Sequence, residues 1–167
     1  MTGSVQSERI STGGRAAGQV LVGDLAALDE LEAEAIGVFC WSDVRPLVGA
    51  AGYLDWRLSG ALSRTLEKQL FDARRSEVML LPAAGRLKVR RVFVFGLGPT
   101  SEAGGTALRH ACRRAYDVMA RAGVHRMVLA APGARRRPEL EQSFLSALAE
   151  ELPGRIDVVL VDRHDGG

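Results

Sequence analysis

Short apolar runs alternate along this chain with longer segments in which apolar residues recur every three or four positions. A continuous apolar run such as Ala35–Trp41 is typical of a strand that is covered on both faces of a sheet. Runs of this kind predict about six strands, at Gln19–Val22, Ala35–Trp41, Val78–Leu81, Arg91–Phe95, Met127–Ala130 and Ile156–Val161.

The segments between these runs predict helices that pack one face on a sheet. The clearest runs from about Tyr53 to Leu70, with leucines on one stripe and basic residues on the other side. A second helix is expected over Thr106–Ala122. A third opens at Pro138, at a position where a helix tolerates proline. A short helix is also expected from a cap at Asp24.

Strands that alternate with helices predict an α/β fold with a mainly parallel sheet. Val78–Leu81 and Arg91–Phe95 are close enough in sequence to pair as a hairpin, which would make the sheet mixed. We therefore expect a single three-layer domain, with a mixed, mostly parallel sheet of about six strands flanked by helices. The domain is expected at 17–161, between a disordered N-terminal tail at 1–16 and a polar C-terminal tail at 162–167.

Composition and net charge limit the kinds of partner and the cellular location that we expect. The chain has 167 residues, which fits one domain, and a net charge of +2, which is too small to demand a polyanionic partner. Cys40 and Cys112 lie far apart in apolar surroundings and are expected to be buried free thiols, as in a reducing compartment. No apolar run reaches the length of a membrane span, so we expect a soluble, cytoplasmic protein with no membrane partner.

A glycine-rich loop follows the Arg91–Phe95 strand and is the main candidate for ligand binding. Its start resembles a dinucleotide fingerprint, but the sixth position is Ser101 rather than glycine, and Pro99 lacks an N–H donor. The helical pattern resumes only near Thr106, which is late for a helix that binds a pyrophosphate. A tight exit from a buried strand explains the loop better, and phosphate binding stays open. The residues that would bind a ligand are Gly96, Gly98, Thr100, Ser101, Gly104 and Gly105.

Two groups of arginines are candidates for anion or nucleic-acid contact. One lies on the outer face of the Thr106–Ala122 helix, and the other precedes the helix that opens at Pro138. The residues are Arg109, Arg113, Arg135, Arg136 and Arg137. A solvated surface explains them better, because net charge is small and the acids Asp117 and Glu139 lie nearby. The spacing of histidines and carboxylates predicts no metal site and no catalytic residue.

The order of the segments carries a resemblance to a known family. A strand ending in Phe39–Trp41 leads to a long helix, then to Glu77–Pro82 with its "LLP", and then to a strand ending in "GLG" at Gly98. An alanine- and arginine-rich helix and Met127–Pro132 follow. This succession resembles the N-terminal domain of the leucyl (cytosol) aminopeptidases, peptidase family M17, over roughly residues 17–161.

The resemblance implies a macro-domain-like fold and a non-catalytic role in assembly, interaction or regulation. Peptidase chemistry in that family, the metal-dependent release of N-terminal amino acids, belongs to a separate domain with two divalent metals such as Zn or Mn. The signature of that domain, NTDAEGRL, is absent here, so no catalytic or metal residue carries over and no cofactor is expected in this chain. The implied partners are a second copy of the chain or an aminopeptidase catalytic subunit. The alternatives are a macro-like binder of ADP-ribose or a nucleotide, and a DNA-binding module.

Overall fold

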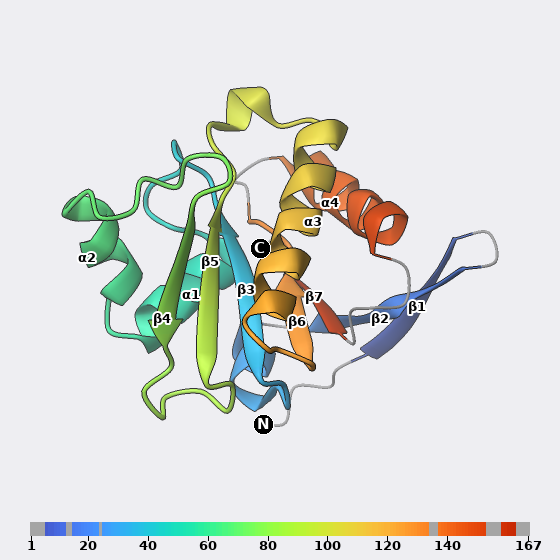
Figure 1. Ribbon diagram of the computed structural model, residues 1–167, viewed down its shortest axis with the longest axis horizontal. Coiled ribbons are helices and arrows are strands. Elements are labelled where there is room, and N and C mark those ends of the chain that lie inside the picture. The colour runs from blue at the N-terminus through green and yellow to red at the C-terminus, as the bar shows by residue number, and fades with distance from the viewer. Residues whose placement is uncertain (1–5, 13–14, 24, 134–136, 153–157, 163–167) are drawn as a thin grey trace.

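The fold is a central sheet with helices on both faces (Figure 1). The computed structural model describes residues 6–12, 15–23, 25–133, 137–152 and 158–162. Within these residues the sheet has seven strands, in the order β1-β2-β7-β6-β3-β5-β4. Their bounds are β1 Gln6–Thr12, β2 Arg15–Gly23, β3 Ala35–Cys40, β4 Val78–Pro82, β5 Arg91–Gly96, β6 Met127–Ala130 and β7 Val158–Asp162.

The sheet is mixed and mostly parallel, as the alternation of strands and helices predicts. The five inner strands, β2, β7, β6, β3 and β5, pair in parallel with one another. At the two edges, β1 pairs with β2 and β4 pairs with β5 in the antiparallel sense. The expected β4–β5 hairpin is therefore confirmed, and it forms one edge of the sheet.

The N-terminal segment differs from the expectation of a disordered tail at 1–16. Residues 6–12 form β1, and β2 begins at Arg15 rather than at Gln19. Polar residues dominate β1, which hides it from a search for apolar runs. Its backbone is stabilised by antiparallel pairing with β2 instead. At the other end Asp162 still belongs to β7, while 1–5 and 163–167 lie outside the described residues.

The prediction of one continuous helix over Tyr53–Leu70 is wrong. The structure has two helices there, α1 Gly49–Arg57 and α2 Ala61–Glu67. Between them Ser59 and Gly60 have φ of 56° and 77°, the left-handed region, which interrupts an α-helix. The Asp55 carboxylate accepts hydrogen bonds from the N–H groups at the start of α2 and so caps it. Leu70 lies beyond α2 and is 75% exposed, so it is not part of the apolar face.

The two later helices agree with the periodicity. Helix α3 covers Gly105–Arg121 and ends before Gly123, whose φ is 78°. Helix α4 covers Pro138–Glu151, with proline in its first turn. Two short 3-10 helices complete the elements, η1 at Leu25–Glu30 and η2 at Thr100–Glu102. No helix among the described residues has the length and apolar character needed to cross a membrane.

Each face of the sheet has its own apolar core. Helices α3 and α4 pack over a core in which Phe39 and Phe144 meet edge to face, with ring centroids 5.0 Å apart. Helices α1 and α2 and the segment η1 cover the other face, where Leu28, Ile36 and Leu54 are buried. Burying a side chain of this size stabilises the fold by about 1.5–3 kcal/mol, so both cores contribute to holding the helices on the sheet.

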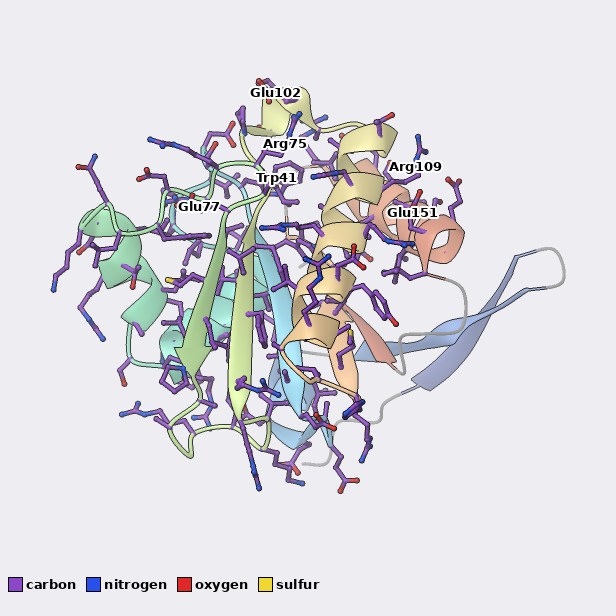
Figure 2. All side chains as sticks on the ribbon, viewed as in Figure 1. Trp41, Arg75, Glu77, Glu102, Arg109 and Glu151 are labelled. Carbon is purple, nitrogen blue, oxygen red and sulfur yellow. The ribbon has the colours of Figure 1, made fainter. Side chains whose placement is uncertain are left out.

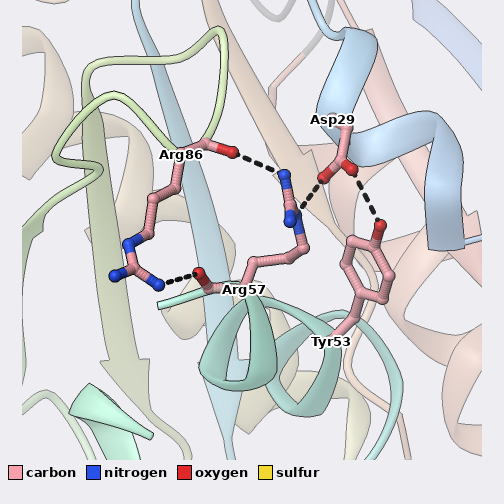
Figure 3. Close-up of polar contacts among 4 residues, drawn as sticks. All are labelled: Asp29, Tyr53, Arg57 and Arg86. Atoms are coloured by element: carbon pink, nitrogen blue, oxygen red, sulfur yellow. Dashed lines mark hydrogen bonds and ion pairs between the residues drawn. The ribbon is translucent and has the colours of Figure 1, made fainter. Parts of the chain in front are cut away.

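A polar cluster holds α1 against η1 and the β4–β5 turn (Figure 3). Asp29 accepts hydrogen bonds from the Tyr53 hydroxyl at 3.1 Å and the Arg57 Nε at 3.0 Å. The Arg57 Nη2 also donates to the Arg86 carbonyl at 2.8 Å. The cluster lies near the amino ends of the parallel strands, away from the loops in which a ligand is expected.

Candidate functional site

The candidate site lies in the loops that follow β3, β5 and β6. These strands are parallel, so their carboxyl ends meet at one edge of the sheet, where α/β proteins place ligands. We call residues 41–48, 97–104 and 131–133 the strand-end loops. The glycine-rich loop that the sequence singles out is the second of them, and it lies at the top of the view in Figure 1.

The backbone donors at the start of this loop are already used within the protein. We call residues 96–98 the glycine corner. The N–H of Gly96 donates to the Glu77 carbonyl at 2.8 Å, and that of Leu97 to the Cys40 carbonyl at 2.9 Å. The N–H of Gly98 donates to the Ala73 carbonyl at 3.0 Å. A phosphate cradle needs several such N–H groups aimed at the ligand, and these aim at the protein itself.

Close packing explains why glycine stands at the corner. A Cβ added to Gly96 would lie 2.0 Å from the carbonyl oxygen of Arg74, which is backbone and cannot rotate away. Gly98 has a φ of 75°, which side-chain-bearing residues rarely adopt. The backbone that presses on the corner is itself fixed, because the Glu77 carboxylate accepts hydrogen bonds from the N–H groups of Asp72 and Arg74.

The hydrogen-bond donors of Thr100 are also used within the protein, by the carboxylate of Asp43. Its N–H donates to Asp43 Oδ1 at 2.9 Å, and its hydroxyl donates to Asp43 Oδ2 at 2.7 Å. Partial burial raises the pKa of Asp43, but the hydrogen bonds from Thr100 and the charge of Arg45 outweigh it, so the net pKa lies below the ordinary value. The carboxylate therefore stays ionised at neutral pH and accepts from both Thr100 donors, which are then not free for an anionic ligand.

The other expected ligand residues lie further along the same loop. Ser101 is exposed within η2, Gly104 is the N-cap of α3, and Gly105 is its first residue. Helix α3 thus starts late, as the sequence indicates, because η2 intervenes. The six expected residues thus run from the last residue of β5 through η2 to the first residue of α3, and the first of them are buried whereas the last are exposed.

The arginines expected to bind nucleic acid are ion-paired where they are described. Arg109 contacts Glu150 at 3.4 Å across the α3–α4 interface and lies near Glu151 (Figure 2). Arg113 contacts Asp117 at 3.5 Å on α3. Arg137 contacts Glu139 at 2.9 Å, and its Nη1 donates to the Thr100 carbonyl at 3.1 Å. Arg135 and Arg136 lie outside the described residues.

The two thiols are poor candidates for chemistry. Burial raises the pKa of Cys40 and of Cys112 to about 12 in each case, so neither forms a thiolate at neutral pH. Both are free and buried, as expected. In the described part of the chain no group of three or more His, Cys, Asp or Glu side chains is arranged to hold a metal ion.

Sequence reasoning missed several polar features near the site. Ser76 Oγ and His110 Nε2 are 3.0 Å apart although the residues are distant in sequence. The Trp41 Nε1 is buried and has no hydrogen-bond partner. Asp43 was missed too, although its place just after β3 marks it as a strand-end residue. The Ser76–His110 contact had no sequence signal, since it depends on how the 71–77 segment packs on α3.

An open hollow lies beside the first strand-end loop. Its volume is about 510 Å³, and residues of that loop and of the segment after α2 line it, including Arg45, Leu47, Phe71 and Asp72. The space beside Ser76 and His110 is far smaller, about 10 Å³, which suits a single water. Of these two spaces near the strand-end loops, only the hollow has the volume for a small molecule.

Comparison with known proteins identifies the type of domain. The family model described as the cytosol aminopeptidase family, N-terminal domain, matches residues 35–156. A mutant of tomato leucine aminopeptidase has a similar structure, with a TM-score of 0.60 and 11% identity over 96% of this chain and 35% of that one. The chain thus spans about a third of the length of the tomato enzyme.

Macrodomains are equally similar in structure. The Oceanobacillus iheyensis macrodomain with MES bound gives a TM-score of 0.66 and 12% identity, over 96% of this chain and 91% of that one. The same macrodomain with ADP gives 0.65 and 12%, over 96% and 90%. A search of curated protein sequences finds no match. At these identities the likeness shows the fold, which is α/β and macrodomain-like.

Proposed function

Since this chain belongs to the N-terminal domain family of the cytosol aminopeptidases, we propose that it is a non-catalytic interaction module that acts in the assembly or regulation of an aminopeptidase. The observation that carries the proposal is that the backbone donors of the glycine corner are used within the protein. Its N–H groups donate to Glu77, Cys40 and Ala73, and the Thr100 donors are taken by Asp43. A loop whose donors are used internally is suited to holding a scaffold together.

The proposed partner is a second copy of the chain or an aminopeptidase catalytic subunit. Any release of N-terminal amino acids, and the two divalent metals that such chemistry uses, would then belong to that catalytic subunit. The cytoplasm is the proposed location, in keeping with a family whose members are described as cytosol aminopeptidases.

Mixing the chain with a leucyl aminopeptidase catalytic subunit from the same organism tests this proposal. We expect the purified chain alone to leave leucine p-nitroanilide intact with added Mn²⁺ or Zn²⁺. We expect it to form a complex with the subunit by sedimentation, or to change the rate of hydrolysis by that subunit. Hydrolysis by the chain alone would contradict the non-catalytic role, and neither complex nor rate change would contradict the partner.

A second candidate function is binding of ADP-ribose or a nucleotide. It is favoured by the similar Oceanobacillus iheyensis macrodomain with ADP and by the open hollow of about 510 Å³ beside the first strand-end loop. Calorimetric titration with ADP and ADP-ribose separates it from the interaction module. Saturable heat that disappears in a variant of a hollow-lining residue, Arg45→Ala, supports binding, and no heat at millimolar ligand rejects it.

DNA binding has weaker support. Arg109, Arg113 and Arg137 each face a carboxylate, so a nucleic acid would have to displace an existing ion pair at each of them. A salt-sensitive gel shift that weakens when these arginines become alanine would restore the idea.

A further inference from the structure

Strand β4 is a free edge of the sheet, and it is apolar. The strand reads Val-Met-Leu-Leu-Pro, and within the described residues its only strand neighbour is β5. The opposite edge, β1, carries Glu8 and Arg9 and has an irregular register between Arg9 and Ser11. Charges, bulges and prolines are the usual protection of an edge against pairing with another chain. Within its bounds β4 has no charge and no bulge, and its one proline is its last residue, Pro82.

The hydrogen-bond register of the hairpin fixes which backbone groups of β4 face outward. Gly96 donates to the Glu77 carbonyl, and Ala83 donates to the Arg90 carbonyl. In an antiparallel pair the residues that bond to the partner alternate, so Glu77, Met79 and Leu81 face β5. The N–H and C=O groups of Val78 and Leu80 therefore point away from the sheet. So does the carbonyl of Pro82, whose missing N–H falls on the outward side.

The side chains of β4 divide between the two faces of the sheet. Met79 and Leu81 pack on the core under α1 and α2, and Val78 packs on the core under α3 and α4. Alternation places Leu80 and Pro82 on the same face as Val78. Leu80 is 51% exposed there, although it stands opposite the buried Phe93. The outward backbone and an exposed leucine thus coincide at one position.

We propose that β4 pairs with β4 of a second copy of this chain, antiparallel and across a two-fold axis at Leu80, so that one sheet runs through both molecules. This proposal names the surface and partner of the interaction module, and so rests on the proposed function. In this register Leu80 and the partner's Leu80 exchange their N–H and C=O groups, and Val78 donates to the carbonyl of the partner's Pro82.

The strand is complementary to itself in this register. Every outward N–H of β4 meets an acceptor, because the residue without an N–H, Pro82, lies opposite Val78 and only accepts. The two leucines bury each other, flanked on each side by a valine and a proline. No charged side chain lies within Val78–Pro82, so the axis opposes no like charges. An unrelated strand would have to supply this pattern of acceptors and apolar side chains, and the chain's own β4 already has it.

Cysteine cross-linking tests both the contact and its register. Opposite residues of a bonded antiparallel pair have Cα atoms about 5.5 Å apart, which suits a disulfide. Leu80→Cys should therefore form a covalent dimer under mild oxidation at least about 10-fold faster than Leu70→Cys, an exposed control outside β4. Val78→Cys should be as slow as that control, because the two copies of residue 78 lie about 13 Å apart along the strands. The native thiols are buried and do not interfere.

The outcomes separate this proposal from the proposed function. Equal rates for Leu80→Cys and Leu70→Cys, or a wild-type chain that sediments as a monomer at about 1 mM, a concentration at which even a weak interface forms, overturn the β4 pairing. If that monomer still binds the aminopeptidase catalytic subunit, the interaction module stands and only its proposed surface fails. If Leu80→Lys abolishes that binding while the wild-type chain is monomeric, the edge accepts a strand of the partner instead, which also overturns self-pairing. Fast cross-linking without binding of the subunit supports self-pairing and rejects the subunit as partner.

Discussion

The glycine corner and the β4 edge are both candidate binding surfaces, and they differ in where their backbone N–H donors point. At the corner, the N–H groups of residues 96–98 all donate to carbonyls of the same chain. At the edge, the register with β5 leaves the N–H groups of Val78 and Leu80 facing outward. In the sequence the corner is the main candidate for ligand binding although a tight exit from a strand explains it better, and in the structure its donors are used within the protein while those of the β4 edge are not.

The difference teaches that glycine content and exposure of donors are separate properties. Glycine at 96 allows the 73–77 backbone to approach closely, glycine at 98 allows a positive φ, and carbonyls of that segment then accept from both glycine N–H groups. In the sequence of β4 only Pro82, at its end, indicates that one side of the backbone is unpaired. A binding surface is therefore better judged from the partners of N–H groups than from residue type.

The largest expected loss of stability comes from a substitution in the glycine corner. Gly96→Ala should lower the free energy of unfolding by about 4 kcal/mol, because the new Cβ meets backbone that has no room to move. Chemical denaturation measures this loss. Gly104→Ala is the matched control from the same loop, since nothing lies within 4 Å of its added Cβ, and its effect should stay below about 1 kcal/mol. Similar losses in both variants would show that the corner is not tightly packed.

The next effect sharpens the assignment of inward and outward groups on β4. Met79→Pro removes a donor to β5 and should destabilise the protein by on the order of 3 kcal/mol, whereas Leu80→Pro removes only an outward donor and should cost about 1 kcal/mol. Thermal unfolding in dilute solution measures both. A reversed order would mean that the hydrogen-bond register of the hairpin is shifted by one residue.

A smaller loss of stability is expected when the contact between Asp43 and Thr100, next to the corner, is weakened. Asp43→Asn weakens the contact with Thr100 and should lower stability by about 1 kcal/mol at pH 7. Because the folded-state pKa of Asp43 is lowered, its contribution is complete above the unfolded pKa of about 4 and is lost as the pH falls through the folded value. The difference between wild type and variant, measured by denaturation from pH 7 to pH 2, should therefore shrink below about pH 4. A difference that grows with acid would contradict the assignment.

The smallest expected effect is the absence of thiol reactivity. Burial raises the pKa of Cys40 and Cys112 to about 12, so iodoacetamide at pH 8 should leave both unmodified in the folded protein and label both in denaturant. Mass spectrometry gives the count. Rapid labelling of the folded chain would show that one of the two cores opens readily.

The sequence predicts well what depends on local periodicity and fails where distant segments meet. Apolar runs locate β3, β5 and β6, and the 3.6-residue stripe locates α3 within a residue. The break between α1 and α2 was not predicted because a single stripe of leucines spans both helices. Gly60 and the capping Asp55 are the sequence signals of this break. Strand β1 was not predicted because its sequence is mostly polar, and its pairing with β2 has no signal in a search for apolar runs.

The sequence predicts the position of the glycine-rich loop after β5, at a strand end where α/β proteins place ligands, but it does not predict the partners of the loop's donors. Ligand binding by this loop stays a prediction. Whether its donors are free depends on Ala73, Glu77 and Asp43, which come from other parts of the chain and reach the loop only through tertiary packing.

Amide hydrogen exchange tests the contrast between the two regions most directly. In dilute wild-type protein, after correction for intrinsic rates, the amides of Gly96, Leu97 and Gly98 should exchange at least about 100-fold more slowly than those of Val78 and Leu80. Raising the protein concentration should slow Val78 and Leu80 alone, as the edges pair. Corner amides that exchange as fast as those of the β4 edge would contradict the account.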